Sequence, residues 1–265
     1  MSGGRVIVHL SDLHFGRHDG RLVRQLYTVV WALRPDVVAV SGDLTQRALA
    51  AQFREARTFM DGLPSPHVIV PGNHDLPLYN PFARVFNPLA GYTQFITRDL
   101  APTLSDEVVW ITGVNTTRAT TWKSGRVDAR ALTRVRATIR NAAPGAVRIL
   151  VAHHPFDAPD SRKAVTALEA LTAAGIDVFL TGHLHASYAG HTAQRYNTGG
   201  RPAIVVEAAT ATSTRLREEP NGFNVLRVAS RSVLVERHAW DGTTFSLNDA
   251  QAFSCGEEGW TAVNG

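Results

Sequence analysis

The chain has 265 residues, of which 44% are hydrophobic and 19% are charged, as is typical of a globular protein with a large core. Its formal net charge of +4 includes no run of Lys or Arg, so composition does not favour a nucleic-acid-binding protein. The single cysteine, Cys255, excludes an internal disulfide framework and a thiolate metal cluster. No apolar stretch resembles a secretory signal or approaches the ~20 residues of a membrane span. We therefore expect a cytoplasmic protein with no membrane span.

Short runs rich in Val and Ile alternate with helical patterns through the first part of the chain. Buried strands are predicted at 5–10, 36–40, 67–70, 107–114, 147–153 and 177–182. Apolar residues that share one helical face predict helices at 21–33, 47–62, 128–142 and 161–174. Strands that alternate with helices indicate βαβ units and a largely parallel sheet.

From about residue 190 the pattern changes to strands at 202–208, 223–229 and 233–240, with no helix between them long enough for a crossover. These runs favour antiparallel strands, which could form a second sheet packed on the first. Because no linker, internal repeat or low-complexity tract interrupts the chain, we expect residues 1–265 to form a single domain.

Residues 76–104 stand apart, with four prolines and five aromatic residues but no clean periodicity. Long irregular segments in compact domains are usually functional or disordered, and the aromatic residues argue against disorder. Two interpretations remain open. The segment is either an excursion over the mouth of a site or an insertion that only packs.

Five predicted strands end in Asp, His or Asn side chains. The polar stretches that follow them are Ser11 to His14, Ser41 to Asp43, Gly72 to Asp75, His153 to Pro155, and Thr181 to His185. Ligands bind at the carboxyl ends of strands in open α/β sheets, so we expect these side chains to share one site. Each stretch alone has an ordinary explanation as a turn or a helix cap, and their joint occurrence carries the signal.

The residue types at these positions indicate a metal site. Carboxylates, imidazoles and one amide oxygen, without a thiolate, suit ions such as Mn, Fe or Zn. Seven donors exceed the roughly four to six ligands of one ion, and they suit two ions that share a carboxylate. Donors two residues apart in DLH and HLH should project to the same side of an extended segment. The predicted donors are Asp12, His14, Asp43, Asn73, His153, His183 and His185.

These motifs resemble those of the calcineurin-like metallophosphoesterase superfamily over roughly residues 5–240: DLH at 12–14, GD at 42–43, GNHD at 72–75, His153, and GHLH at 182–185. SDLHFG, SGDLT and the stretch 209–224 are closer to the bacterial branch that contains class III cyclic-nucleotide phosphodiesterases. That branch usually has Arg-Gly-Glu-Pro in the last stretch, and Glu218 stands at the Gly position here.

The resemblance implies an α/β fold, a four-layer αββα sandwich of two mixed sheets flanked by helices, with two metal ions at the carboxyl edge of the strands. One ion would be held by Asp12, His14, Asp43 and His185. The other would be held by Asp43, Asn73, His153 and His183, so that Asp43 bridges the two ions. Dimers occur in the resembled branch, so a homodimer is an open expectation.

His74 is the candidate catalytic residue, because it neighbours Asn73 and is left over from the ligand set. It would supply a proton or positive charge to the leaving oxygen, or it merely braces the turn. His154 is a candidate contact to the phosphate, or a loop residue fixed by Pro155. Arg84 and Arg215 are candidate contacts to an anionic substrate, or ordinary exposed arginines.

Together these features predict a dinuclear-metal phosphodiesterase acting on small phosphodiesters of the cyclic-nucleotide or glycerophosphodiester type. In-line attack by a metal-bridging hydroxide would cleave the ester. The main alternative is a phosphomonoesterase or pyrophosphatase acting on a nucleotide or a lipid-linked substrate. A nuclease or a non-catalytic scaffold is less expected, and no specific nucleic-acid partner is expected.

Overall fold

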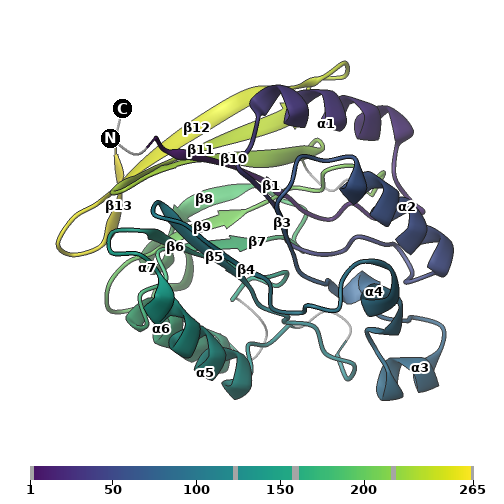
Figure 1. The fold of residues 1–265 in the computed structure, drawn as a ribbon, viewed down its shortest axis with the longest axis horizontal. Helices are drawn as coiled ribbons and strands as arrows, with labels where there is room; N and C mark the ends of the chain where they lie inside the picture. Colours follow the sequence, from purple (N-terminus) through teal and green to yellow (C-terminus); the bar gives the residue numbers. More distant parts are fainter. Residues whose placement is uncertain (1–2, 122–124, 157–160, 216–218, 264–265) are drawn as a thin grey trace.

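The structure is a computed structural model that describes residues 3–121, 125–156, 161–215 and 219–263. Two β-sheets stack face to face, and helices lie on the outer side of each (Figure 1). This arrangement is the predicted four-layer αββα sandwich. Among the described residues, no helix combines the length and the apolar character needed to cross a membrane.

The first sheet has seven strands in the order β13-β12-β11-β10-β1-β2-β3. β1, β2 and β3 run parallel, whereas β10 to β13 continue the sheet from β1 as antiparallel neighbours. The bounds are Arg5–Leu10 (β1), Val37–Val40 (β2), His67–Ile69 (β3), Gly222–Ala229 (β10), Ser232–Trp240 (β11), Phe245–Cys255 (β12) and Trp260–Val263 (β13).

The second sheet has six strands in the order β4-β5-β6-β7-β9-β8. β5, β6, β7 and β9 run parallel, and β4 and β8 are antiparallel edge strands. The bounds are Thr103–Ser105 (β4), Val109–Gly113 (β5), Val147–Val151 (β6), Val178–Thr181 (β7), Tyr188–His191 (β8) and Ile204–Glu207 (β9).

Seven α-helices and two 3-10 turns complete the described fold. Their bounds are Gly20–Leu33 (α1), Ala50–Asp61 (α2), Asn73–Asp75 (η1), Pro81–Phe86 (α3), Ala90–Phe95 (α4), Ala129–Thr138 (α5), Ile139–Asn141 (η2), Ser161–Ala173 (α6) and Thr192–Tyr196 (α7). α1 shows why these segments are helical, since Leu22, Leu26 and Val30 recur every four residues and are all buried.

Three apolar cores hold the four layers together. Because successive side chains of a strand point to opposite faces, Ile7 of β1 packs between the sheets while Val8 packs under α1 and α2. In β6, Ile149 joins the same central core, and Leu150 joins a third core beneath α5 and α6. The strands are therefore apolar on both faces, and this leaves their ends as the polar positions.

The strand assignment from sequence needs one correction. The early strands do not form a single parallel sheet, because β1 to β3 belong to the first sheet and β5 to β7 to the second. The late strands divide in the same way. β9 lies parallel to β7, whereas β10 and β11 extend the first sheet. A strand that is apolar on both faces carries no periodicity that identifies its partners. The short or exposed elements β4, β8, β12, β13 and α7 were not predicted.

Residues 76–104 contain one half that packs on the fold and one half that is exposed. The α4 half packs, since the buried Tyr92 donates from its hydroxyl to the Ile69 carbonyl at 3.1 Å, and Phe95 stacks on Phe53 of α2. The α3 half exposes apolar side chains, including Phe82 and Phe86. The segment is thus anchored at one end and exposed at the other.

Candidate metal centre

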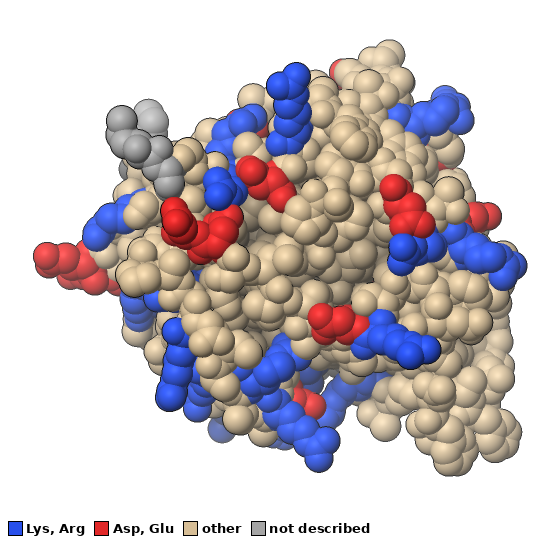
Figure 2. Space-filling view, viewed as in Figure 1, with Lys and Arg blue, Asp and Glu red and all other residues tan. Residues whose placement is uncertain are grey.

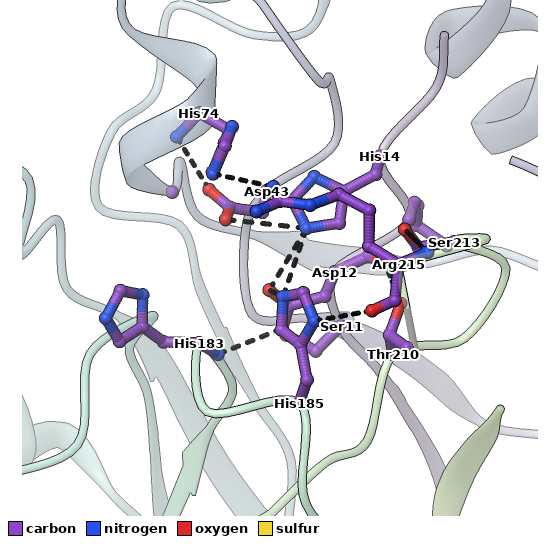
Figure 3. Close-up of polar contacts among 12 residues, drawn as sticks. Ser11, Asp12, His14, Asp43, His74, His183, His185, Thr210, Ser213 and Arg215 are labelled. Atoms are coloured by element: carbon purple, nitrogen blue, oxygen red, sulfur yellow. Dashed lines mark hydrogen bonds and ion pairs between the residues drawn. The ribbon is translucent and has the colours of Figure 1, made fainter. Parts of the chain in front are cut away.

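The predicted donors come together where the carboxyl ends of five strands meet. Asp12 and His14 follow β1, Asp43 follows β2, Asn73 lies in η1 after β3, His153 follows β6, and His183 and His185 follow β7. Figure 3 shows Asp12, His14, Asp43 and His185 directed toward one another, with the His183 ring to one side. Both sheets therefore contribute to the site.

The backbone at the site is unusual. Asp12, His14, Asp43, His183 and His185 have φ angles of 52°, 50°, 52°, 72° and 57°, in the left-handed region that residues other than glycine rarely adopt. The expectation that DLH and HLH are extended is therefore wrong, because both donors of each motif have left-handed backbone conformations. Such backbone strain concentrates at functional sites, where the surrounding structure holds it in place.

A first group of donors consists of Asp12, His14 and His185, whose candidate ligand atoms lie within 4.8 Å of one another. The Nε2 atoms of the two histidines are 3.2 Å apart, and His185 Nε2 is 3.1 Å from Asp12 Oδ1. His185 donates from Nδ1 to the Arg215 carbonyl at 3.2 Å, so the Nε2 of the neutral ring bears a lone pair.

Burial opposes the charge of Asp12, but the imidazoles of His14 and His185 outweigh burial and hold the pKa of Asp12 well below its usual value. Asp12 Oδ1 is buried and accepts no hydrogen bond from a described residue. A carboxylate oxygen and imidazole lone pairs that face one another at this spacing fit a bound cation.

A second group of donors lies on the other side of Asp43. His153 donates from Nδ1 to the Ser41 carbonyl at 2.7 Å, which turns its Nε2 toward Asn73 Oδ1 at 3.1 Å and Asp43 Oδ2 at 3.4 Å. Burial lowers the pKa of His153, but the Asp43 and Asp12 carboxylates outweigh burial and raise it to about 9. The oxygens around His153 therefore favour a positive charge at this position.

His183 completes the second group and belongs to a different cluster from His185. Its candidate ligand atom lies within 4.8 Å of those of His153 and His154. Burial and the neighbouring His153 lower the pKa of His183 to about 4, so the ring is neutral and can donate a lone pair. The HLH motif thus supplies one histidine to each group rather than two to the same group.

Asp43 stands between the groups, with Oδ2 3.4 Å from His153 Nε2 and 3.8 Å from His14 Nε2. Its Oδ1 accepts the backbone N–H of His74 at 2.8 Å. Gly72 makes this approach feasible, because a Cβ there would lie 2.1 Å from Asp43 Oδ1.

His154 faces the second group but differs from the other histidines. The Thr116 hydroxyl oxygen lies 2.8 Å from His154 Nδ1 and accepts the His154 backbone N–H at 3.3 Å. When the Thr116 hydroxyl donates to Nδ1, the ring proton lies on Nε2. Nε2 is buried and has no partner among the described residues. In that tautomer His154 directs a donor into the site, whereas the other tautomer would direct a lone pair there, beside His153 and His183.

A cavity of about 310 Å³ opens over the donors. It is lined by Asp43, Gln46, Arg47, Asn73, His74, Leu76, Leu78, Arg84, His183, His185 and Arg215. His74 donates from Nδ1 to the Gln46 carbonyl at 2.9 Å, and its Nε2 lies 3.3 Å from Arg215 Nη1 (Figure 3). Metal donors, His74 and cationic side chains thus share one opening.

The two candidate arginines have different surroundings. Arg84 lines the cavity, but its guanidinium donates to the carbonyls of Ala119, Pro77 and Thr121. Arg215 instead lies beside His74 at the mouth. Glu218, at the position where the resembled branch has Gly, lies outside the described residues.

Sequence reasoning missed three residues that shape the site. Gln46 and Arg47 line the cavity, and their position just after Asp43 in the same loop was an available signal. Thr116 orients His154 from a separate loop, and nothing in the sequence pattern indicated that contact.

Comparisons with known proteins agree with this fold. A search of curated protein sequences found no match. The structure of PhoD is similar with a TM-score of 0.75 at 10% identity, over 99% of this chain and 72% of that one. A purple acid phosphatase from yellow lupin (Lupinus luteus) seeds has a TM-score of 0.71 at 13% identity, over 96% of this chain.

The chain spans about half of the lupin enzyme, 54% of its length. A predicted phosphoesterase from Streptococcus pneumoniae has a TM-score of 0.52 at 12% identity, over 96% of this chain and 99% of that one. Identities this low show a shared fold alone. The family model for calcineurin-like phosphoesterases, however, matches residues 5–187, which include all seven predicted donors. The chain therefore belongs to the calcineurin-like phosphoesterase family.

Proposed function

We propose that the chain is a two-metal phosphodiesterase acting on small phosphodiesters of the cyclic-nucleotide or glycerophosphodiester type. The observation that carries this proposal is the arrangement of seven donors in two groups with the Asp43 carboxylate between them. The family is metal-dependent, and the described clusters of His and Asp suit Mn, Fe or Zn.

Asp12, His14, Asp43 and His185 would hold one ion, and Asp43, Asn73, His153 and His183 the other. When bound, two such ions supply positive charge to the phosphoryl oxygens and lower the pKa of the attacking water. The protein contributes by fixing the donors. The Nδ1 bonds of His153 and His185 to backbone carbonyls orient their Nε2 atoms inward.

Other side chains would act on the substrate itself. With its ring proton on Nε2, His154 would donate a hydrogen bond to a phosphoryl oxygen, since Nε2 has no hydrogen-bond partner among the described residues. Arg215 would pair with a substrate oxygen at the mouth. Arg84, already bonded to three carbonyls, would contribute mainly its charge.

His74 would protonate the leaving oxygen. Its Nδ1 bond to Gln46 fixes the ring with Nε2 toward the cavity. When the His74 ring is protonated, its Nε2–H would donate a hydrogen bond to the leaving oxygen. Arg215, which contacts Nε2 in the structure, would then pair with the phosphate instead.

One observation favours the alternative of a phosphomonoesterase or pyrophosphatase. Arg47, Arg84 and Arg215 all line the cavity, and three cations suit a substrate with more charge than a diester.

A comparison of two chromogenic substrates tests the proposal. Protein reconstituted separately with Mn²⁺, Fe²⁺ and Zn²⁺ should cleave bis(p-nitrophenyl) phosphate faster than p-nitrophenyl phosphate, and chelator should abolish both rates. A faster monoester reaction would favour the alternative. Metal-free protein that still cleaves either ester in excess chelator would overturn the two-metal assignment.

A further inference from the structure

A cluster of apolar side chains lies exposed beside the cavity. Tyr79, Phe82, Val85 and Phe86, here called the rim cluster, are 75%, 75%, 65% and 81% exposed. In Figure 2 the corner occupied by α3 in Figure 1 is a tan surface without acidic or basic side chains. An exposed apolar patch of this kind on a folded protein indicates a binding surface.

The helix α3 produces the rim cluster by its periodicity. Asn80 caps the helix by accepting the Ala83 N–H at 2.8 Å. Val85 and Phe86 lie three and four residues after Phe82, which places them on the same side of the helix as Phe82. Arg84 falls on another face, where it is 4% exposed and bonded to carbonyls. The helix therefore turns its charge inward and its apolar residues outward.

The rim cluster continues the wall of the cavity. Leu76 and Leu78 line the cavity, and Tyr79 follows them directly in the chain. The guanidinium of Arg47, another lining residue, lies 5.4 Å from the centre of the Tyr79 ring. An apolar surface thus leads outward from the cationic opening over the predicted metal donors.

The size of the cluster argues against a second copy of this chain as its partner. Three aromatic side chains of about 150–250 Å² each, roughly three-quarters exposed, present on the order of 450 Å². A standard protein–protein interface needs about 800 Å² from each partner. A lipid surface needs no matching partner, and aromatic residues beside arginines are the combination that anchors proteins at anionic lipid surfaces.

We propose that the rim cluster inserts into lipid and that, within the glycerophosphodiester type, the substrate is one that carries acyl chains. Its head group would enter the cavity, where Arg47 and Arg215 meet its charge, and its chains would lie along Phe82, Val85 and Phe86. The hydrolytic part of this inference rests on the proposed function, whereas lipid binding does not.

Vesicle binding tests the surface independently of activity. Wild-type protein should co-sediment with vesicles of equal parts phosphatidylcholine and phosphatidylglycerol, and Phe82→Ser/Phe86→Ser should bind about tenfold more weakly or worse. The matched control is Leu247→Ser/Val263→Ser, which removes apolar groups that are 56% and 44% exposed on β12 and β13. It should bind like the wild type, and circular dichroism should show all three proteins folded.

Three outcomes would overturn the proposal. The first is that the wild type fails to bind vesicles, and the second is that both double variants bind as well as the wild type. The third is that the wild type is a dimer and Phe82→Ser/Phe86→Ser is a monomer. The last result would identify a second copy as the occupant.

A kinetic comparison tests the substrate class. Wild-type protein should have a higher kcat/KM for phosphatidylglycerol in mixed micelles than for the same phosphodiester without acyl chains. In Phe82→Ser/Phe86→Ser this ratio of kcat/KM values should fall about tenfold, because KM for the phosphatidylglycerol rises. An unchanged ratio would overturn the lipid substrate. Vesicle binding without hydrolysis of any ester would instead refute the proposed function and leave the lipid surface standing.

Discussion

The predicted metal donors and the residues that hold them, here called the floor, are mostly buried, whereas the rim cluster is largely exposed. Asp12, His14 and His153 are 0% exposed, but Phe82 and Phe86 are 75% and 81% exposed. Hydrogen bonds hold the floor residues, several of which have left-handed backbone conformations, and one short helix carries most of the rim cluster. The contrast matches the two proposed roles: donors for a small cation need fixed positions, and a surface that meets a large ligand needs to be accessible.

The largest expected effect comes from the residue at the centre of the floor. Asp43→Ala should remove a ligand from both predicted ions, and should lower kcat/KM by about 10³-fold or more, equivalent to several kcal/mol of transition-state stabilisation. Elemental analysis should find both metals depleted, whereas Leu247→Ser, on β12, should retain them. Wild-type metal content in Asp43→Ala would refute the bridging role.

His74 lies between floor and rim, so its replacement should separate catalysis from metal binding. His74→Ala should retain metal but lose about 10²-fold in rate on an alkyl ester, whose leaving oxygen needs a proton. The loss should be smaller for p-nitrophenyl esters, which leave without help. Equal losses for both leaving groups would contradict a proton-donating role, and would leave His74 as a brace for its turn.

The floor could be anticipated from sequence better than the rim. Asp12, Asp43 and His153 each follow an apolar strand, so their meeting at the carboxyl edge followed from the behaviour of strand ends. The left-handed backbone of Asp12 was not foreseeable, because it depends on contacts with loops distant in the chain. One such contact is the 2.9 Å bond from the His183 N–H to Asp12 Oδ2.

The sequence also did not predict which sheet each strand joins, or which side chains of the rim are exposed. Strands apolar on both faces did not show which sheet they join, and so β9 was grouped with β10. Residues 76–104 mix buried Tyr92 with exposed Phe86, and no local pattern distinguishes them. Their difference arises only when α4, and not α3, packs on α2.

Substitution of a glycine on the floor should destabilise the protein more than substitution of a glycine at the surface. In Gly72→Ala the added Cβ would meet Asp43 Oδ1 at 2.1 Å, so the floor must shift at a cost of about 1–3 kcal/mol in the free energy of unfolding. Gly199→Ala is the control, because a Cβ there meets nothing within 4 Å. Urea denaturation of both variants would show the difference, and equal stabilities would mean that the floor is more adaptable than we infer.

The free energy of unfolding should also fall in acid because of His9, which contacts the floor through Ser41. His9 Nε2 is 2.9 Å from the Ser41 hydroxyl, and the Ser41 carbonyl accepts from His153. Burial lowers the pKa of His9 to about 3, whereas an unfolded histidine titrates near 6.5. Below about pH 6.5 the unfolded chain therefore binds a proton that the folded chain excludes, and stability falls with pH until about pH 3.

The contribution of His9 to the free energy of unfolding falls by at most about 1.4 kcal/mol per pH unit. Between pH 7 and pH 5 the total loss is about 2 kcal/mol. His9→Gln should be less stable than the wild type at pH 7, because it disturbs the bond to Ser41, and the gap should narrow as pH falls. Ser41→Ala keeps the buried imidazole and should retain the wild-type slope. Urea denaturation in chelator at pH 7, 6 and 5 would measure all three proteins. A constant gap between His9→Gln and the wild type would show that His9 carries no pH dependence, because the other titrating groups are common to both proteins.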